Sequence, residues 1–405
     1  MTFSYWTRRL TVVACCFIAV SLAGCAESTE LDAGGGDSGS GAVDSGGTDA
    51  GGTDAGRSDS GSRDASVDGG PPEPCDGLED CVVTTANVQS IWWSDGTLFW
   101  IAAPRTDDLG NPRSGPTLFQ QSIPGGAPEE VVELAMPSGG ITQIVGAAGD
   151  FVVTMASVVG GVRISRTNTE TAAVESIVPD FDLEDVASAG DDLFLTGTQD
   201  AIAGIWATSI STAGTPTLLA AADGRSFDEV VASETRVAVS GSGPAPDFGD
   251  NRVWVVSRED GTFVGSPRTI GGAGGWVVGV DEEVMLALHE GGQIHSHFED
   301  RSIVISEGDE LGDRIPQELL HRGWVYRIDT ERGLIRAPTR IGRELDVVLP
   351  LSDGIEAGVP FALGGGFVFW ASATEIRRAV LSAPPCAEDI DCGGTGALCV
   401  DGACG

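Results

Sequence analysis

The sequence predicts an all-β protein, a seven-bladed β-propeller, and two observations carry this prediction. From about residue 82 to 383, short β-rich runs alternate with turns that contain Gly, Asp or Pro, and helical periodicity is hard to find. Seven of these runs follow a turn in the same way and recur at spacings of 40 to 53 residues. Their aligned positions are Leu98, Phe151, Leu193, Val237, Val284, Trp324 and Phe367.

A period of 40 to 50 residues with about four strands in each unit is typical of a propeller. One repeat shows all four expected strands, at residues 141–146, 151–156, 162–166 and 173–178. The last repeat ends after residues 376–380, one strand short, and we expect residues 82–85 to supply the missing strand. Such a closure removes an exposed sheet edge. A six-bladed propeller or a pair of β-sandwiches is the alternative, although a sandwich does not explain the steady period.

Residues 1–24 are expected to be a signal peptide. Arg8 and Arg9 precede an apolar run over residues 10–22, which is shorter than the about 20 residues that a membrane-spanning helix needs. The run ends in Leu22-Ala23-Gly24-Cys25, which resembles the lipobox of bacterial lipoproteins. The resemblance implies export, lipid attachment at Cys25 and an outer-membrane location, on the periplasmic or the cell-surface face. An ordinary signal peptide with a chance cysteine is the alternative.

Residues 25–73 are predicted to be a disordered linker behind the lipid anchor. Residues 26–73 consist mainly of Gly, Ser, Ala, Thr and Asp and carry 11 acidic residues against two arginines. A segment with so little apolar content cannot offset the entropy of ordering. As a flexible coil it spans roughly 40 Å, which is enough to hold a domain away from a membrane.

Cysteines flank the repeats of the predicted propeller, which spans residues 74–385, and residues 386–405 are a predicted disulfide-rich tail. Six cysteines remain after Cys25, and an even number in an exported chain indicates disulfides. A zinc site is the alternative, but the C-x2-C spacing and a nearby histidine are missing. Six cysteines allow fifteen pairings; one bridge between Cys75 and Cys81 with two in the tail is the simplest, and bridges between the two ends are also open. The six are Cys75, Cys81, Cys386, Cys392, Cys399 and Cys404.

Two repeats, GGFVFWASATEIRRAV and RGWVYRIDTERGLIRAP, are similar to the YWTD-type repeats of lipoprotein-receptor propellers. The tail is similar to small cysteine-rich tails of exported bacterial proteins. The YWTD resemblance implies a propeller that binds proteins through its loops. That family generally has six blades, and its Thr-Asp pair is replaced here by Ala371-Ser372 and Arg327-Ile328. The prediction of seven blades therefore rests on the repeat count.

Three of the four histidines, His289, His295 and His297, lie within nine residues in a predicted hairpin. A two-residue loop places His289 on the opposite face from the other two, whereas a three-residue loop over residues 290–292 places all three on one face. We favour the second register because it gives one apolar and one polar face. Such a site suits a transition metal, with Glu299 or Asp300 around it. The apolar face contains Val284, Leu286, Leu288, Ile294 and Phe298.

The composition excludes several classes of function. The chain has a net charge of −37 and no lysine, which argues against nucleic-acid binding, a phosphate-binding loop and a protein kinase. We expect a monomeric, non-catalytic binding or scaffold module without a cofactor, whose partner is an envelope or extracellular protein or a glycan. An envelope enzyme, either metal-dependent through the histidines or acting on glycans through paired carboxylates, is the alternative, and a purely structural envelope component is a third.

Overall fold

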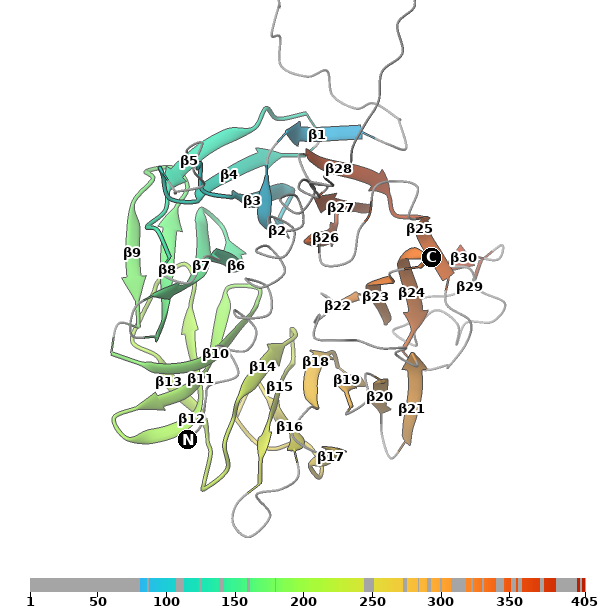
Figure 1. Cartoon of the computed structure of the whole chain (residues 1–405). Coiled ribbons are helices and arrows are strands. Elements are labelled where there is room, and N and C mark those ends of the chain that lie inside the picture. The colour runs from blue at the N-terminus through green and yellow to red at the C-terminus, as the bar shows by residue number, and fades with distance from the viewer. Residues whose placement is uncertain are drawn as a thin grey trace, which may run out of the picture.

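Seven four-stranded antiparallel sheets form a ring around a central axis, and a two-stranded sheet lies near the C-terminus (Figure 1). The prediction of a seven-bladed propeller is therefore confirmed, and the six-bladed and sandwich alternatives are wrong. The computed structural model describes residues 81–85, 87–106, 113–123, 125–137, 142–158, 161–178, 180–243, 251–271, 275–282, 284–289, 293–298, 301–306, 318–321, 323–329, 331–339, 346–350, 355, 359–371, 375–383, 399–400 and 403–404.

The blades follow one another in chain order, and we number them 1 to 7. Blade 1 contains β2 (Val88–Ser94), β3 (Thr97–Ala102), β4 (Thr117–Ser122) and β5 (Glu129–Glu133). Blade 2 contains β6 (Thr142–Ala148), β7 (Phe151–Val158), β8 (Gly161–Asn168) and β9 (Val174–Ile177). Blade 3 contains β10 (Asp182–Ala189), β11 (Asp192–Gln199), β12 (Ile202–Ser209) and β13 (Thr217–Ala221).

The remaining blades repeat this order. Blade 4 contains β14 (Glu229–Ala232), β15 (Arg236–Ser242), β16 (Asn251–Ser257) and β17 (Arg268–Gly271). Blade 5 contains β18 (Trp276–Val280), β19 (Val284–Leu288), β20 (Ile294–Phe298) and β21 (Arg301–Ser306). Blade 6 contains β22 (Glu318–His321), β23 (Trp324–Asp329), β24 (Gly333–Pro338) and β25 (Asp346–Pro350). Blade 7 contains β26 (Phe361–Gly364), β27 (Phe367–Ala371), β28 (Glu375–Val380) and β1 (Cys81–Thr85).

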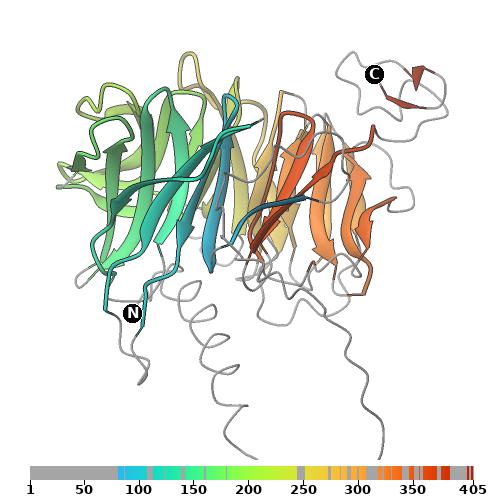
Figure 2. The same cartoon turned by 90° about the horizontal axis from the view of Figure 1, so that it is seen from above.

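The first strand of each blade lies nearest the axis. These strands contact one another in sequence around the ring, from β2 through β6, β10, β14, β18 and β22 to β26, and β26 contacts β2. Seen from the side, the strands of every blade cross the disc from one face to the other (Figure 2). The turn between the first and second strands and the turn between the third and fourth strands therefore share one face.

The ring is closed by a strand from the N-terminal side of the domain. β1 pairs antiparallel with β28, with Cys81 opposite Arg378 and Thr85 opposite Glu375. The seventh blade thus combines three strands from the end of the domain with one from its start, as the sequence predicted. This pairing covers the edge of β28, which would otherwise be open to association.

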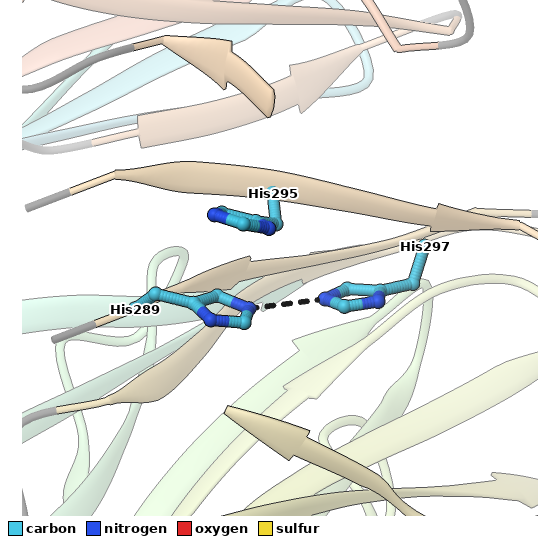
Figure 3. A group of neighbouring side chains, drawn as sticks. All are labelled: His289, His295 and His297. Atoms are coloured by element: carbon cyan, nitrogen blue, oxygen red, sulfur yellow. Dashed lines mark hydrogen bonds between the residues drawn. The ribbon is translucent and has the colours of Figure 1, made fainter. Parts of the chain in front are cut away.

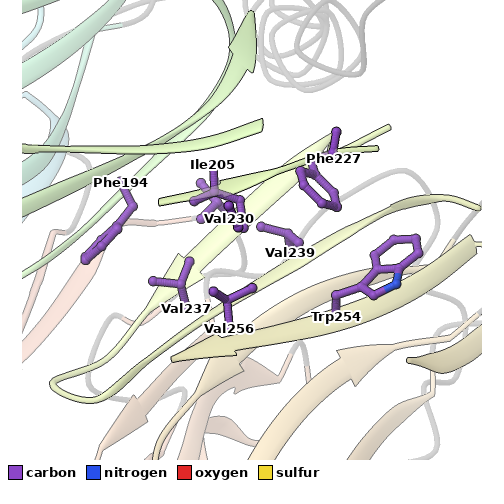
Figure 4. Packing of buried hydrophobic residues seen from close by; sticks show 10 residues of the cluster. Phe194, Ile205, Phe227, Val230, Val237, Val239, Trp254 and Val256 are labelled. Atoms are coloured by element: carbon purple, nitrogen blue, oxygen red, sulfur yellow. The ribbon is translucent and has the colours of Figure 1, made fainter. Parts of the chain in front are cut away.

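The core is divided among the blade interfaces. Seven apolar clusters lie one at each junction between neighbouring blades. Figure 4 shows the junction of blades 3 and 4, where Phe194 and Ile205 pack against Val237, Val239 and Trp254. Each second strand is buried on both of its faces, which explains why these strands form continuous apolar runs in the sequence. Trp100, Trp254, Trp324 and Trp370 are all buried in these junctions.

Tight turns connect the first three strands of several blades. Asp95 and Gly96 have φ angles of 45° and 82°, and Asp200 and Ala201 have 52° and 63°. Two consecutive left-handed residues make the type I′ turn whose twist matches that of a two-stranded ribbon. Asp95 lies at the β2–β3 turn and Asp200 at the β11–β12 turn, so these two aspartates lie at opposite faces of the disc.

Several sequence predictions concern residues that the structure does not describe. Cys25, the linker of residues 26–73, Cys75, Cys386 and Cys392 lie outside the described residues, as do Glu299 and Asp300. Near the C-terminus, β29 (Cys399–Val400) and β30 (Ala403–Cys404) form the two-stranded sheet, with Cys399 opposite Cys404. In the part of the chain that is described, we find no helix with the length and apolar character that crossing a membrane requires.

Candidate functional site

The predicted histidine hairpin is formed by β19 and β20, in the three-residue-loop register. Val284 pairs with Phe298 and Leu288 with Ile294, and the His289 amide donates to the Gln293 carbonyl at 2.8 Å. Because residues alternate between the two faces of a strand, His289, His295 and His297 share one face. The apolar residues Val284, Leu286, Leu288 and Ile294 share the other face, as predicted.

Protein covers part of the histidine face, which the sequence did not show: His297 is buried, and His289 and His295 are partly exposed. Met285 and Ala287 lie on this face and are buried against Val253 and Ile270 of blade 4. The opposite face, with Val284 and Leu286, packs against blade 6. The histidines therefore lie at the junction of blades 4 and 5, beside the apolar cluster that contains Val253, Ile270, Met285 and Ala287.

The three imidazole rings are nearly parallel and close together (Figure 3). The Nε2 atoms of His289 and His297 lie 3.2 Å apart. The His295 ring is stacked on that of His289, with a centroid distance of 3.7 Å and an interplanar angle of 20°. One ligand nitrogen from each residue lies within 4.8 Å of the other two.

Among the residues that the structure describes, Ser302, Gln293 and Arg268 place polar groups around the histidines. The Nδ1 atom of His295 lies 3.4 Å from the Ser302 hydroxyl of β21, and its Nε2 atom lies 3.3 Å from Oε1 of Gln293. The guanidinium of Arg268, in β17 of blade 4, acts electrostatically on His297. Because Oε1 of Gln293 can only accept, the Nε2 atom of His295 donates to it and the Ser302 hydroxyl donates to Nδ1, so a metal that binds His295 replaces one of these two contacts.

Burial lowers the pKa of all three imidazoles and so favours their neutral form. It lowers the pKa of His289 to about 4, with a further contribution from His295. Burial also lowers the pKa of His297 to about 4, and His289, His295 and Arg268 contribute in the same direction. The pKa of His295 is lowered by burial as well. A neutral imidazole has one unprotonated nitrogen, which is the form that binds a metal.

A second feature is a depression on the face that carries the turns between first and second strands. Its volume is about 410 Å³, and turns from three successive blades line it. The sequence did not reveal this feature, because its lining residues are small or turn-forming and come from separate repeats. They are Ser94 at the end of β2 and Asp95 of the β2–β3 turn, Ala147 and Ala148 at the end of β6 and Gly149 of the β6–β7 turn, Gly190 and Asp191 of the β10–β11 turn, and Ser211 after β12.

Hydrogen bonds fix the carboxylate of Asp191 in this depression. The Ser211 amide donates to Oδ1 at 2.8 Å, and the hydroxyls of Ser209 and Ser211 donate to Oδ2 at 2.8 Å. Burial opposes ionisation of Asp191, but the hydrogen bonds from Ser211 and Ser209 outweigh it and keep the pKa of this carboxyl below its ordinary value, with help from Arg166. Asp95 is exposed. The depression therefore presents negative charge.

No protein-family model and no curated protein matches this chain. Solved structures match the fold at low identity. The β-propeller domain of the Trilobed protease from Pyrococcus furiosus is 12% identical, covers 75% of this chain and 97% of that chain, and has a TM-score of 0.47. An acylaminoacyl peptidase from Pyrococcus horikoshii is 11% identical over 74% of this chain, with a TM-score of 0.45. This chain spans 52% of that peptidase. BamB from Moraxella catarrhalis is 13% identical, covers 72% of this chain and 85% of that chain, and has a TM-score of 0.42.

Two of these matches correct the expectation that the chain is not an enzyme. A protease domain and a peptidase both align with this propeller. The expectation of a non-catalytic module was therefore wrong as an exclusion, because this propeller fold occurs in both a protease and a peptidase. Likeness at 11–12% identity concerns the fold alone, and a fold does not specify a reaction.

Proposed function

We propose that this protein is a binding module of the cell envelope that takes its partner at the depression on one face of the propeller. One observation carries the proposal: residues at the turns of three successive blades line the depression. Turn residues tolerate sequence change better than buried strands do, so a rigid propeller that presents them is a suitable scaffold for recognition. A concave site of about 410 Å³ accepts a few side chains of a partner.

The charge of the site indicates the chemistry of the partner. Asp95 and Asp191 bring two carboxylates to the depression, and the whole chain has a net charge of −37. A strongly acidic protein steers positively charged partners toward itself. We therefore propose that the partner is an envelope or extracellular protein that offers a basic segment.

The N-terminal sequence supports the location. The lipobox-like residues 22–25 support lipid attachment at Cys25, and the acidic linker of residues 26–73 supports a tether between the lipid and the propeller. Membrane fractionation of cells that express the wild type or Cys25→Ser tests this part. The wild type is expected in the outer-membrane fraction and the variant in the soluble exported fraction. Equal distribution of the two proteins would contradict the anchor.

Site-specific cross-linking on intact cells tests the binding face. A photoreactive residue at Thr212, an exposed position beside Ser211, probes the depression, and one at Ile202 probes the opposite end of the same strand β12. We expect a discrete cross-linked species from position 212 that Asp95→Asn weakens. Asp200→Asn is the matched control, because Asp200 is also an exposed left-handed aspartate but lies at the other face. Equal cross-linking from both positions, or from neither, would contradict the proposal.

A further inference from the structure

We propose that His289, His295 and His297 form a binding site for a divalent transition metal of the zinc and copper class. The site lies between blades 4 and 5 and is separate from the depression, which lies on blades 1 to 3. The inference therefore goes beyond the proposed binding function, and neither depends on the other.

The distances are those of a site that is nearly formed. Two nitrogens bound to one tetrahedral zinc ion at about 2.0–2.1 Å are about 3.3–3.4 Å apart. The Nε2 atoms of His289 and His297 are already 3.2 Å apart. The third nitrogen lies within 4.8 Å of both, but the His295 ring is stacked on that of His289, so the His295 side chain must rotate to aim its in-plane lone pair at the same ion. Its partial exposure leaves room for that rotation.

The surroundings make a purely structural role for the three histidines costly. The same junction contains Ala238, Val253, Ile270 and Met285, all buried and apolar. Buried polar groups lower stability unless their hydrogen-bonding capacity is satisfied, and an apolar residue at these positions would avoid that cost. One shared proton links His289 to His297, and a metal ion would instead accept electron pairs from all three residues.

The ligand type selects the class of ion. Ca²⁺ and Mg²⁺ require oxygen ligands, whereas imidazole suits Zn²⁺, Cu²⁺ and Ni²⁺. Three protein ligands leave a fourth position for water or for an atom of a bound molecule. When a metal takes the place of Gln293 at Nε2 of His295, the Nδ1 proton can go to Ser302, which then orients the ring as the outer partners of metal-bound histidines do. Arg268 adds positive charge nearby, which favours an anionic fourth ligand such as hydroxide.

Titration of the full chain with Zn²⁺ and, separately, with Cu²⁺ tests the site. Calorimetry and the metal content after dialysis are expected to give one equivalent, with affinity at least 100-fold weaker in His289→Gln and in His297→Gln. His321→Gln is the matched control, because His321 lies in β22 outside the cluster, and it is expected to bind like the wild type. Co²⁺ gives a second readout, since tetrahedral coordination produces an intense visible absorption band that the cluster variants should lack.

The variants separate metal bound at the histidines from metal bound elsewhere on the chain. Every variant retains all cysteines and the acidic linker. Metal bound at those residues is therefore present in wild type and variants alike, and the difference in metal content between them reports the histidine site. Should His297→Gln fail to fold, His295→Gln decides, because that side chain is half-exposed and its replacement leaves the apolar packing intact. Absence of stoichiometric binding, or equal binding by the wild type and the cluster variants, would overturn the proposal.

Discussion

The guanidinium of Arg336 in blade 6 donates a 2.6 Å hydrogen bond from Nη1 to the backbone oxygen of Ser382, which follows the third strand of blade 7. Arg336 is only 2% exposed and lies over the ring of Trp324. Its Nε atom donates to Asp346 of the outer strand at 2.7 Å. One side chain thus joins the third and fourth strands of its own blade and the end of the third strand of the next.

Arg166 makes the same set of contacts between blades 2 and 3. Its Nη1 atom donates to the Ile210 and Ser211 carbonyls at 2.8 and 2.6 Å, its Nε atom donates to Glu175 at 2.6 Å, and its guanidinium lies over Phe151. The repeats therefore share a polar connection between blades in addition to their apolar pattern. This explains two of the arginines in a chain that otherwise has few basic residues.

We predict that Arg336→Met destabilises the propeller by about 1–3 kcal/mol, because the Ser382 and Ala383 carbonyls lose their donor while Asp346, 34% exposed, can turn to solvent. Arg332→Met is the control on the same β23–β24 hairpin. Arg332 pairs with Asp329 at 3.1 Å but is 47% exposed, and its loss is expected to cost about 0–1 kcal/mol. Equilibrium unfolding in urea measures both values. Equal losses in the two variants would contradict the structural role assigned to Arg336.

The second prediction concerns pH and the acidic groups near the axis. Burial raises the pKa of Asp228, although a hydrogen bond from Ser226 opposes this, and burial together with Asp228 and Asp182 raises the pKa of Glu184. A raised pKa means that the folded protein binds the proton more tightly than the unfolded chain does. Near neutral pH the folded state must bury a charge, so Asp228→Asn is expected to increase stability there.

The gain from Asp228→Asn should disappear in acid. Below the ordinary aspartate pKa of 3.8, the wild-type carboxyl is neutral in both states, so wild type and variant should unfold at similar temperatures. Thermal unfolding of both proteins between pH 3 and pH 8 measures the difference. Asp200→Asn is the control, because it makes the same substitution at an exposed turn, where no charge is buried. A gain that is the same at every pH would show that burial of charge is not the cause.

The third prediction concerns the junction of blades 7 and 1. A Cβ atom added at Gly364 would overlap the indole ring of Trp93, which is stacked on Phe369 at a centroid distance of 5.2 Å. Gly364→Ala is therefore expected to cost about 1–3 kcal/mol through overpacking. Gly214→Ala, where the new methyl meets nothing within 4 Å, is expected to be nearly neutral. Rescue of Gly364→Ala by Trp93→Leu would identify the overlap as the cause, and failure of that rescue would argue against it.

The fourth prediction concerns closure of the ring. Deleting residues 1–85 removes β1 and leaves β28 as an open edge. We expect a lower unfolding temperature and concentration-dependent association, because open edges recruit other strands. Deleting only residues 26–73 is the control and should leave the unfolding temperature unchanged. Calorimetry with size-exclusion chromatography at two concentrations measures both effects, and a monomeric, equally stable protein without β1 would refute this role.

The fifth prediction assigns a disulfide. Cys399 and Cys404 are directly opposite in the β29–β30 pair, and opposite residues of antiparallel strands have Cα atoms about 4.5–5.5 Å apart, within the range of a disulfide. We predict a Cys399–Cys404 bridge, with Cys75 paired to Cys81 and Cys386 to Cys392. Mass spectrometry of an unreduced digest checks the pairing. A peptide that links Cys75 or Cys81 to the tail would contradict it.

The sequence alone determined the architecture. All seven second strands were located at the residues that begin or nearly begin β3, β7, β11, β15, β19, β23 and β27, because strands buried on both faces form apolar runs that the repeat period picks out. Closure by β1 followed from a last repeat that lacked a strand. The register of the histidine hairpin followed from the alternation of apolar and polar residues, which a shift of one position would reverse.

Only the tertiary structure decided which polar residues are buried between the blades. His297 was expected on a polar strand face but is buried against blade 4, and Arg336 is buried although arginine usually lies at the surface. The depression combines turns from three repeats, and the raised pKa of Asp228 depends on its burial. A repeat pattern specifies which residues form a blade. Contacts between residues more than 40 positions apart depend on how neighbouring blades pack, and those contacts set the burial and charge of each site.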